Sequence, residues 1–111
     1  MTKDDVDLRL NAAQRRYEAW SGDVLAGRAE FGFAEGVIVF THTVVGEPFQ
    51  GRGIATRLIK YALDDVRSRG ERSVVAHCPM VKAWIDRHED YQDLLRSGGG
   101  QAYGGRPSAE S

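Results

Sequence analysis

Two segments with different hydrophobic periods flank the stretch Gly46-Glu47-Pro48-Phe49-Gln50-Gly51-Arg52-Gly53-Ile54-Ala55. Before it, residues 37–45 (VIVFTHTVV) are β-branched almost throughout and begin apolar on both faces, which is typical of a central strand. After it, apolar residues recur at helical spacing, at positions 54, 55, 58, 59, 62, 63 and 66, and Gly70 stands where a glycine ends a helix. The sequence therefore predicts a strand, a glycine-rich loop and a long helix.

The segments on either side predict a mixed α/β fold. Upstream, three strand-like runs separated by turn residues predict an antiparallel meander: residues 6–10, 16–20 and 24–33. Downstream, Ser73–Cys78 predicts a second buried strand that Pro79 ends, and Val81–His88 predicts a short helix that continues loosely to Leu95. The order is ββββαβα, in which a right-handed crossover makes the last two strands parallel.

Length and composition fit one domain. The 111 residues are 41% hydrophobic and 28% charged, close to the averages for globular proteins. A chain of this size buries roughly 65% of its extended surface on folding, enough for a real core. We expect residues 5–95 to form the domain, with a monomer as the default state, and residues 96–111, rich in glycine and serine, to form a flexible tail.

Charge and sequence motifs indicate the cellular compartment of the protein and the classes of partner it lacks. Fifteen Lys and Arg residues against sixteen Asp and Glu residues do not favour nucleic-acid binding. No apolar run approaches the roughly 20 residues that span a bilayer, and the N-terminal residues lack the apolar centre of a secretory signal. The single cysteine, Cys78, cannot form an internal disulfide, which suits a reducing compartment. We therefore expect a cytoplasmic protein without membrane or nucleic-acid partners.

The loop has the features of an anion site. Gly51 and Gly53 allow a tight turn that brings backbone N–H groups close to a ligand, and the helix from Ile54 adds its positive dipole end. A phosphate or pyrophosphate fits best. A Rossmann fingerprint would need a third glycine at Thr56, and a Walker A loop would need Lys at Arg52, so neither applies. The alternative is a glycine turn that only joins strand to helix.

Three loop residues match a family signature. Gln50, Gly53 and Ala55 fit the pattern Gln/Arg-x-x-Gly-x-Gly/Ala between a strand and a long helix. A wider run fits as well: His42-Thr43, residues 51–55, Ala62-Leu63, Arg67, Gly70, Cys78-Pro79, and His88 with Tyr91 and Leu94. Over residues 11–95 the chain resembles the small, single-domain members of the Gcn5-related N-acetyltransferase superfamily that lack its first helices. It departs at Glu89, where those relatives usually have proline.

The resemblance implies acetyl-CoA as cosubstrate. The backbone of Gln50, Gly51, Arg52, Gly53, Ile54 and Ala55 would hold the pyrophosphate, with the hydroxyl of Thr56 as a further partner. Val44 and Val45 would pair with the pantetheine arm as with an added strand. The two parallel strands would splay apart to admit the acetyl group. A splayed pair leaves backbone groups unpaired, and the amides of such an arm satisfy them.

Cys78 and His42 are the candidate catalytic residues. Cys78 lies at the end of the second parallel strand, where the resemblance places the cleft, and a thiol there is a nucleophile or a contact to the acceptor. The alternative is a buried structural thiol. His42 is expected to face the same cleft as a base toward the amine or toward Cys78, or else to be a hydrogen-bonded structural residue. His77 points away from Cys78, and no spacing predicts a metal site.

Three functions are consistent with these features. The first is an N-acetyltransferase that uses acetyl-CoA and modifies an amine, on a small molecule or a protein lysine. The second is a CoA-binding or acyl-CoA-sensing module that keeps the loop but transfers nothing. The third is an interaction protein that uses the glycine loop only structurally. Short motifs do not define the acceptor.

Overall fold

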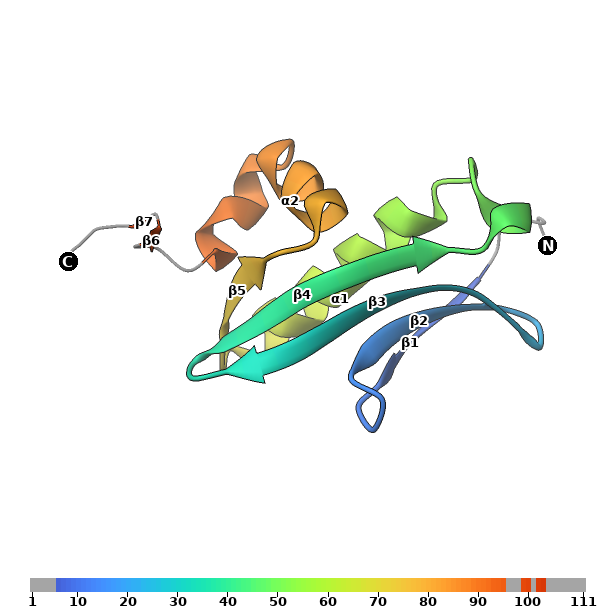
Figure 1. Cartoon of the computed structure of the whole chain (residues 1–111), viewed down its shortest axis with the longest axis horizontal. Coiled ribbons are helices and arrows are strands. Elements are labelled where there is room, and N and C mark those ends of the chain that lie inside the picture. The colour runs from blue at the N-terminus through green and yellow to red at the C-terminus, as the bar shows by residue number, and fades with distance from the viewer. Residues whose placement is uncertain (1–5, 96–98, 101, 104–111) are drawn as a thin grey trace.

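The computed structural model describes residues 6–95, 99–100 and 102–103. The elements follow in chain order (Figure 1): β1 (Asp7–Asn11), β2 (Arg16–Ser21), β3 (Val24–Ala34), β4 (Val37–Val45), the 3-10 helix η1 (Glu47–Phe49), α1 (Ile54–Arg69), β5 (Ser73–Ala76), α2 (Pro79–Asp86), the 3-10 helix η2 (Glu89–Leu94), β6 (Gly99–Gly100) and β7 (Ala102–Tyr103). None of the helices in the described part of the chain has the length and apolar character needed to span a membrane.

A five-stranded sheet in the order β1-β2-β3-β4-β5 forms the framework. The first four strands are antiparallel, and β5 pairs parallel to β4, from Val37 opposite Ser73 to Phe40 opposite Ala76. The predicted order and the parallel last pair are confirmed. The short strands β6 and β7 pair with each other in the segment expected to be a tail, whose other residues lie outside those described.

The first three strands differ from the prediction by one residue at one or both ends, and the larger differences lie around and after Pro79. β5 ends at Ala76 rather than Cys78, because the N–H groups of His77 and Cys78 both turn to the Phe40 carbonyl oxygen, at 3.0 and 2.9 Å. α2 begins at Pro79 rather than Val81, since proline needs no N–H partner in the first helical turn. The last turns before Leu95 are the 3-10 helix η2 rather than a continuation of α2.

The core lies between one face of the sheet and the two α-helices. One cluster of buried side chains joins both helices to β2, β3, β4 and β5. Leu58 and Leu63 of α1 are fully buried in it, and the Tyr17 hydroxyl of β2 donates a 2.8 Å hydrogen bond to Asp65 of α1. The apolar stripe that predicted the helix is therefore its packing face.

A β-bulge in β4 decides which side chains reach this core. Phe31 pairs with Phe40 and Glu30 pairs with His42, so Thr41 is an extra residue in β4. Beyond the bulge, Val45 packs against the core, whereas Val44 on the opposite face is exposed. His42 shares the outer face with Val44, and Thr43 shares the inner face with Val45.

Candidate site at the β4–α1 loop

The loop between β4 and α1 uses glycine where other residues would be strained. Gly51 has φ 81° and Gly53, the N-cap of α1, has φ 75°, both in the left-handed region. A Cβ atom at either position would meet no atom within 4 Å, so backbone conformation and not packing demands glycine there. The space beside both glycines is open.

Short hydrogen bonds anchor the loop to the sheet. The Gln50 side-chain amide donates to the Val45 carbonyl oxygen at 3.0 Å, which ties the loop to the end of β4. The Gly46 N–H donates to the Ala26 carbonyl oxygen at 2.8 Å, and the Phe49 N–H closes η1 on Gly46 at 2.9 Å. The Arg52 guanidinium lies 5.8 Å from the centre of the Phe49 ring. These contacts tie the first part of the loop to the ends of β3 and β4.

The first turn of α1 presents backbone N–H groups to a cavity. An α-helix leaves its first N–H groups without partners inside the helix, and here the first bond to the N-cap runs from Arg57 to Gly53 at 3.1 Å. A cavity of about 200 Å³ lies beside this turn, lined by the loop, residues 54–56 and Met80 of α2. These N–H groups and the helix dipole favour an anion in this cavity.

Beside the loop, β4 extends beyond its parallel partner. Among the described residues, β5 pairs with β4 only as far as Phe40 opposite Ala76, while β4 continues to Val45. The bulge at Thr41 falls where the pairing stops, and bulges bend a strand and increase its twist. Val44 and Val45 thus border a gap in the sheet, the stretch of β4 that β5 leaves without a parallel partner.

Cys78 lies on the inner side of this gap. Its side chain is buried, at the N-cap of α2, and its thiol donates a 3.5 Å hydrogen bond to the Thr43 hydroxyl. Burial alone would raise the pKa of the Cys78 thiol. The Thr43 hydroxyl and the backbone N–H groups of Val81 and Met80 outweigh burial, so the pKa is lowered from 9.0. This environment favours the thiolate, which is the nucleophilic form.

His42 lies on the other face of β4. Its imidazole is exposed, with Nδ1 3.9 Å from Glu30 Oε1, and Glu30 in turn accepts a 2.6 Å bond from Arg28. His42 and Cys78 therefore lie on opposite faces, which corrects the expectation of His42 as a base toward Cys78, whereas its role as a base toward the amine stays a prediction. The extra residue Thr41 changes the strand's alternation after Phe40, so Thr43 reaches the thiol and His42 turns outward.

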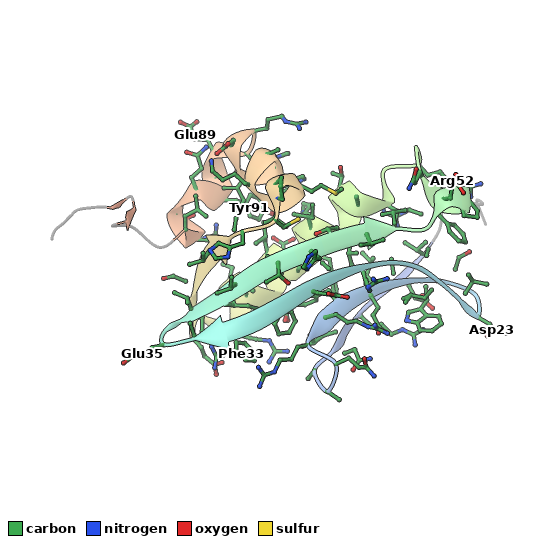
Figure 2. All side chains as sticks on the ribbon, viewed as in Figure 1. Asp23, Phe33, Glu35, Arg52, Glu89 and Tyr91 are labelled. Atoms are coloured by element: carbon green, nitrogen blue, oxygen red, sulfur yellow. The ribbon has the colours of Figure 1, made fainter. Side chains whose placement is uncertain are left out.

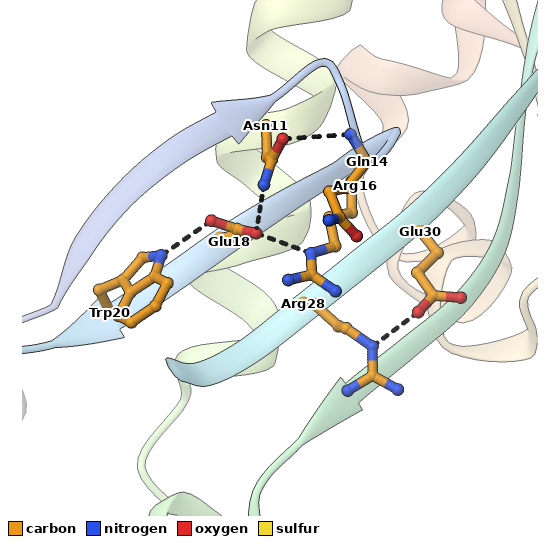
Figure 3. Close-up of polar contacts among 7 residues, drawn as sticks. All are labelled: Asn11, Gln14, Arg16, Glu18, Trp20, Arg28 and Glu30. Atoms are coloured by element: carbon orange, nitrogen blue, oxygen red, sulfur yellow. Dashed lines mark hydrogen bonds and ion pairs between the residues drawn. The ribbon is translucent and has the colours of Figure 1, made fainter. Parts of the chain in front are cut away.

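A polar network that the sequence analysis did not predict covers this outer face (Figure 3). The Glu18 carboxylate is only 3% exposed and accepts hydrogen bonds from the side chains of Asn11, Arg16 and Trp20. Burial opposes ionisation, but these three donors lower the pKa of Glu18 below 4.5. In β2 and β3 the charged residues stand two apart in the sequence, and this alternation is the signal that would have placed their side chains on one face of the sheet.

The other two histidines do not lie on the inner side of the gap, where Cys78 lies. His77 is exposed. The His88 ring stacks on the Trp84 ring with their centres 3.8 Å apart, and His88 Nδ1 lies 2.7 Å from the Trp84 carbonyl oxygen. These contacts hold the end of α2. Tyr91 donates a 2.6 Å hydrogen bond to Asp64 of α1 and so helps hold η2. Within the described residues, no cluster of His, Cys, Asp and Glu side chains has the arrangement of a metal site.

Comparisons with known proteins agree with this architecture. A family profile described as GCN5-related N-acetyl-transferase matches residues 16–94, more than half of the chain. Among solved structures, the chain is similar to ribosomal-protein-alanine N-acetyltransferase from Brucella melitensis biovar Abortus 2308, at 22% identity and a TM-score of 0.50. The match covers 86% of this chain and 66% of that one, just under two thirds of its length, and concerns the fold. Curated proteins gave no match.

Proposed function

Because this chain belongs to the GCN5-related N-acetyltransferase family, we propose that it transfers an acetyl group from acetyl-CoA to an amine, on a small molecule or a protein lysine. One observation carries the proposal. The positive-φ glycines at the start of α1 border a cavity of about 200 Å³, directly beside the strand segment that β5 leaves unpaired. A phosphate-bearing ligand with an amide arm fits both features.

The chain's own groups account for binding. The N–H groups at Gly51 and Gly53 and in the first turn of α1 would hold the pyrophosphate, with the Thr56 hydroxyl beside them. The open space above both glycines leaves room for phosphate oxygens close to the backbone. Val44 and Val45 would pair with the pantetheine amides along the edge of the gap. Acetyl-CoA supplies the thioester whose acetyl group is transferred.

We assign Cys78 and His42 to the two sides of the gap. His42, exposed on the outer face next to Glu30, would take a proton from the acceptor amine as that amine attacks. Cys78, with its lowered pKa, would attack the thioester carbonyl from the inner face. A new C–S bond to the acetyl group would form, the C–S bond to CoA would break, and the proton given up by Cys78 would go to the leaving CoA thiolate. The amine would then displace Cys78. Direct attack by the amine on the thioester is the alternative route and uses His42 alone.

Calorimetric titration of acetyl-CoA and CoA into the full chain tests the binding site. Wild type is expected to bind both. Gly53→Val should weaken binding at least tenfold, because a β-branched residue does not tolerate φ 75°. Gly32→Ala is the matched control, since a Cβ there also meets nothing within 4 Å but φ is ordinary. No binding by wild type, or equal binding by Gly53→Val, would refute the loop assignment.

Intact mass after incubation with acetyl-CoA then tests transfer. A gain of one acetyl group that is absent in Cys78→Ala supports the covalent route. An amine screen in which only His42→Ala loses activity supports direct transfer. Binding without transfer to any amine would instead favour a CoA-binding or acyl-CoA-sensing module. This module is the second candidate because both described α-helices pack in the core on the inner face of the sheet, so neither of them shapes an acceptor pocket on the outer face.

A further inference from the structure

A second cavity lies at the opposite end of the sheet and has no part in the proposed function. We propose that it binds a small aromatic carboxylate. The ring of the ligand would lie among Tyr17, Phe31 and Phe33, and its carboxylate would lie at Arg69 and Arg72.

The cavity is far from the acetyl-transfer site along the same helix. Val66 and Arg69, near the end of α1, line it, whereas Ile54 begins α1 at the glycine loop. A 16-residue helix is about 24 Å long. Figure 2 shows Phe33 near the β3–β4 turn and Arg52 beyond the other end of β4. The two cavities are therefore separate sites on one scaffold.

The size and lining of the cavity suit one aromatic ring. Its volume is about 150 Å³, which is the size at which an apolar protein cavity accepts benzene. Tyr17, Phe31, Ile38 and Val66 form its buried walls. The Tyr17 and Phe31 rings are 5.4 Å apart and tilted by 48°, a spacing and tilt typical of favourable aromatic packing.

Phe33 and Arg72 line the mouth of the cavity, and Arg15 lies next to Phe33. Phe33 is 44% exposed, a large apolar side chain at the surface, and its ring lies 5.3 Å from Phe31. The Arg72 guanidinium lies 4.2 Å from the Phe33 ring centre, and that of Arg15 lies 5.1 Å away. Arg15 has φ 55°, which is unusual for a residue other than glycine, and its carbonyl oxygen accepts the Phe31 N–H at 3.0 Å. This left-handed backbone places the Arg15 guanidinium over Phe33, beside the residues that line the cavity.

Two carboxylates of the chain already contact the arginines that line the cavity. Asp65 accepts hydrogen bonds from the Tyr17 hydroxyl at 2.8 Å and from Arg69 at 2.9 Å. Glu71 lies 3.5 Å from Arg72, and both side chains are exposed. A ligand carboxylate would replace Glu71 at Arg72. The end of α1 carries partial negative charge, and the arginines offset it for a bound anion.

Titration of the ¹⁵N-labelled full chain, followed by NMR, tests the proposal. Benzoate should shift the amide signals of Phe31, Ile38 and Val66, with a Kd on the order of 1 mM for so small a ligand. Benzamide, which has the same shape without the charge, should bind at least fivefold more weakly. Acetate, which has the charge without the ring, should not shift these signals.

Substitutions in the protein distinguish recognition of the ligand's ring from recognition of its carboxylate. Arg72→Gln should weaken benzoate binding at least fivefold and leave benzamide unchanged, whereas Leu10→Phe, which fills the cavity from β1, should abolish both. Arg87→Gln, exposed after α2, is the control. Gly53→Val should keep benzoate binding, which separates this test from that of the acetyl-CoA site. Equal shifts with acetate, shifts only at residues 51–56, or no shifts by about 20 mM benzoate, far above the expected Kd, would overturn the proposal.

Discussion

At the level of single residues, the Thr43 hydroxyl is one of the groups that lower the pKa of Cys78. Burial raises the pKa of the Cys78 thiol, but the Thr43 hydroxyl, 3.5 Å from Sγ, lowers it because the hydroxyl donates a hydrogen bond to the thiolate once the thiol is deprotonated. We expect Thr43→Val, which keeps the shape but lacks the hydroxyl, to raise the pKa of Cys78 above its wild-type value. Ultraviolet absorbance of the thiolate, followed as a function of pH, measures this shift directly.

Thr43→Ser is the matched control because it keeps the hydroxyl. It should leave the thiolate titration close to that of wild type. If Val and Ser move the curve equally, the shape of residue 43 and not its hydroxyl governs the thiol, and the role given to Thr43 fails. Thr43 adjoins His42 in sequence, yet the two residues reach opposite faces because of the bulge at Thr41.

At the level of elements, Glu18 holds the outer face of the meander together. Its buried carboxylate accepts bonds from β1 through Asn11 and from β2 through Arg16 and Trp20. Glu18→Gln should lower the free energy of unfolding at pH 7 by about 2 kcal/mol, because charge-assisted bonds are lost and one donor is left unpaired. Urea unfolding measures this, and Glu89→Gln, on exposed η2, should change little.

The pH dependence follows from the direction of the Glu18 shift. Since the pKa of Glu18 is lower in the folded protein than in the unfolded chain, its contribution is complete above the unfolded value and is lost as pH falls through the folded value. The stability difference between wild type and Glu18→Gln should therefore shrink once the pH falls below the ordinary glutamate pKa of 4.5. A difference that stays constant below this pH would show that the carboxylate's charge contributes nothing.

The elements also show what the sequence can and cannot predict. Alternation and the helical stripe predicted β1 to β4 and α1, because local pattern and packing face coincide there. The bulge at Thr41 escaped prediction because a β-branched run looks the same with or without an extra residue. That single residue decides whether His42 or Thr43 meets Cys78. Spacing predicted the loop glycines, but the partners of each side chain come from tertiary contacts.

For the whole molecule, α1 and β4 join two separate cavities through one core. The glycine loop lies at one end of both elements, and the aromatic cavity lies at the other. The Phe40 ring centre lies 6.2 Å from that of Tyr17, which lines the aromatic cavity. The Phe40 carbonyl oxygen accepts hydrogen bonds from the N–H groups of His77 and Cys78. The two sites therefore depend on the same packed core, so the limits of that core decide which part of the chain is needed for both.

Leu94 and Leu95 are the last residues with core contacts in the continuous described segment, and they set those limits. Leu94 is buried, and Leu95 bridges to Val74 of β5. We predict that a chain truncated after Leu95 unfolds in urea as one cooperative transition, with a free energy within about 0.5 kcal/mol of the full chain, and binds CoA equally well. Truncation after Arg87 removes η2 and both leucines and should lose that transition, because Val74 and α1 then lose their cover. If the first truncation costs more than about 1 kcal/mol, residues 96–111 belong to the folded unit and the domain does not end at residue 95.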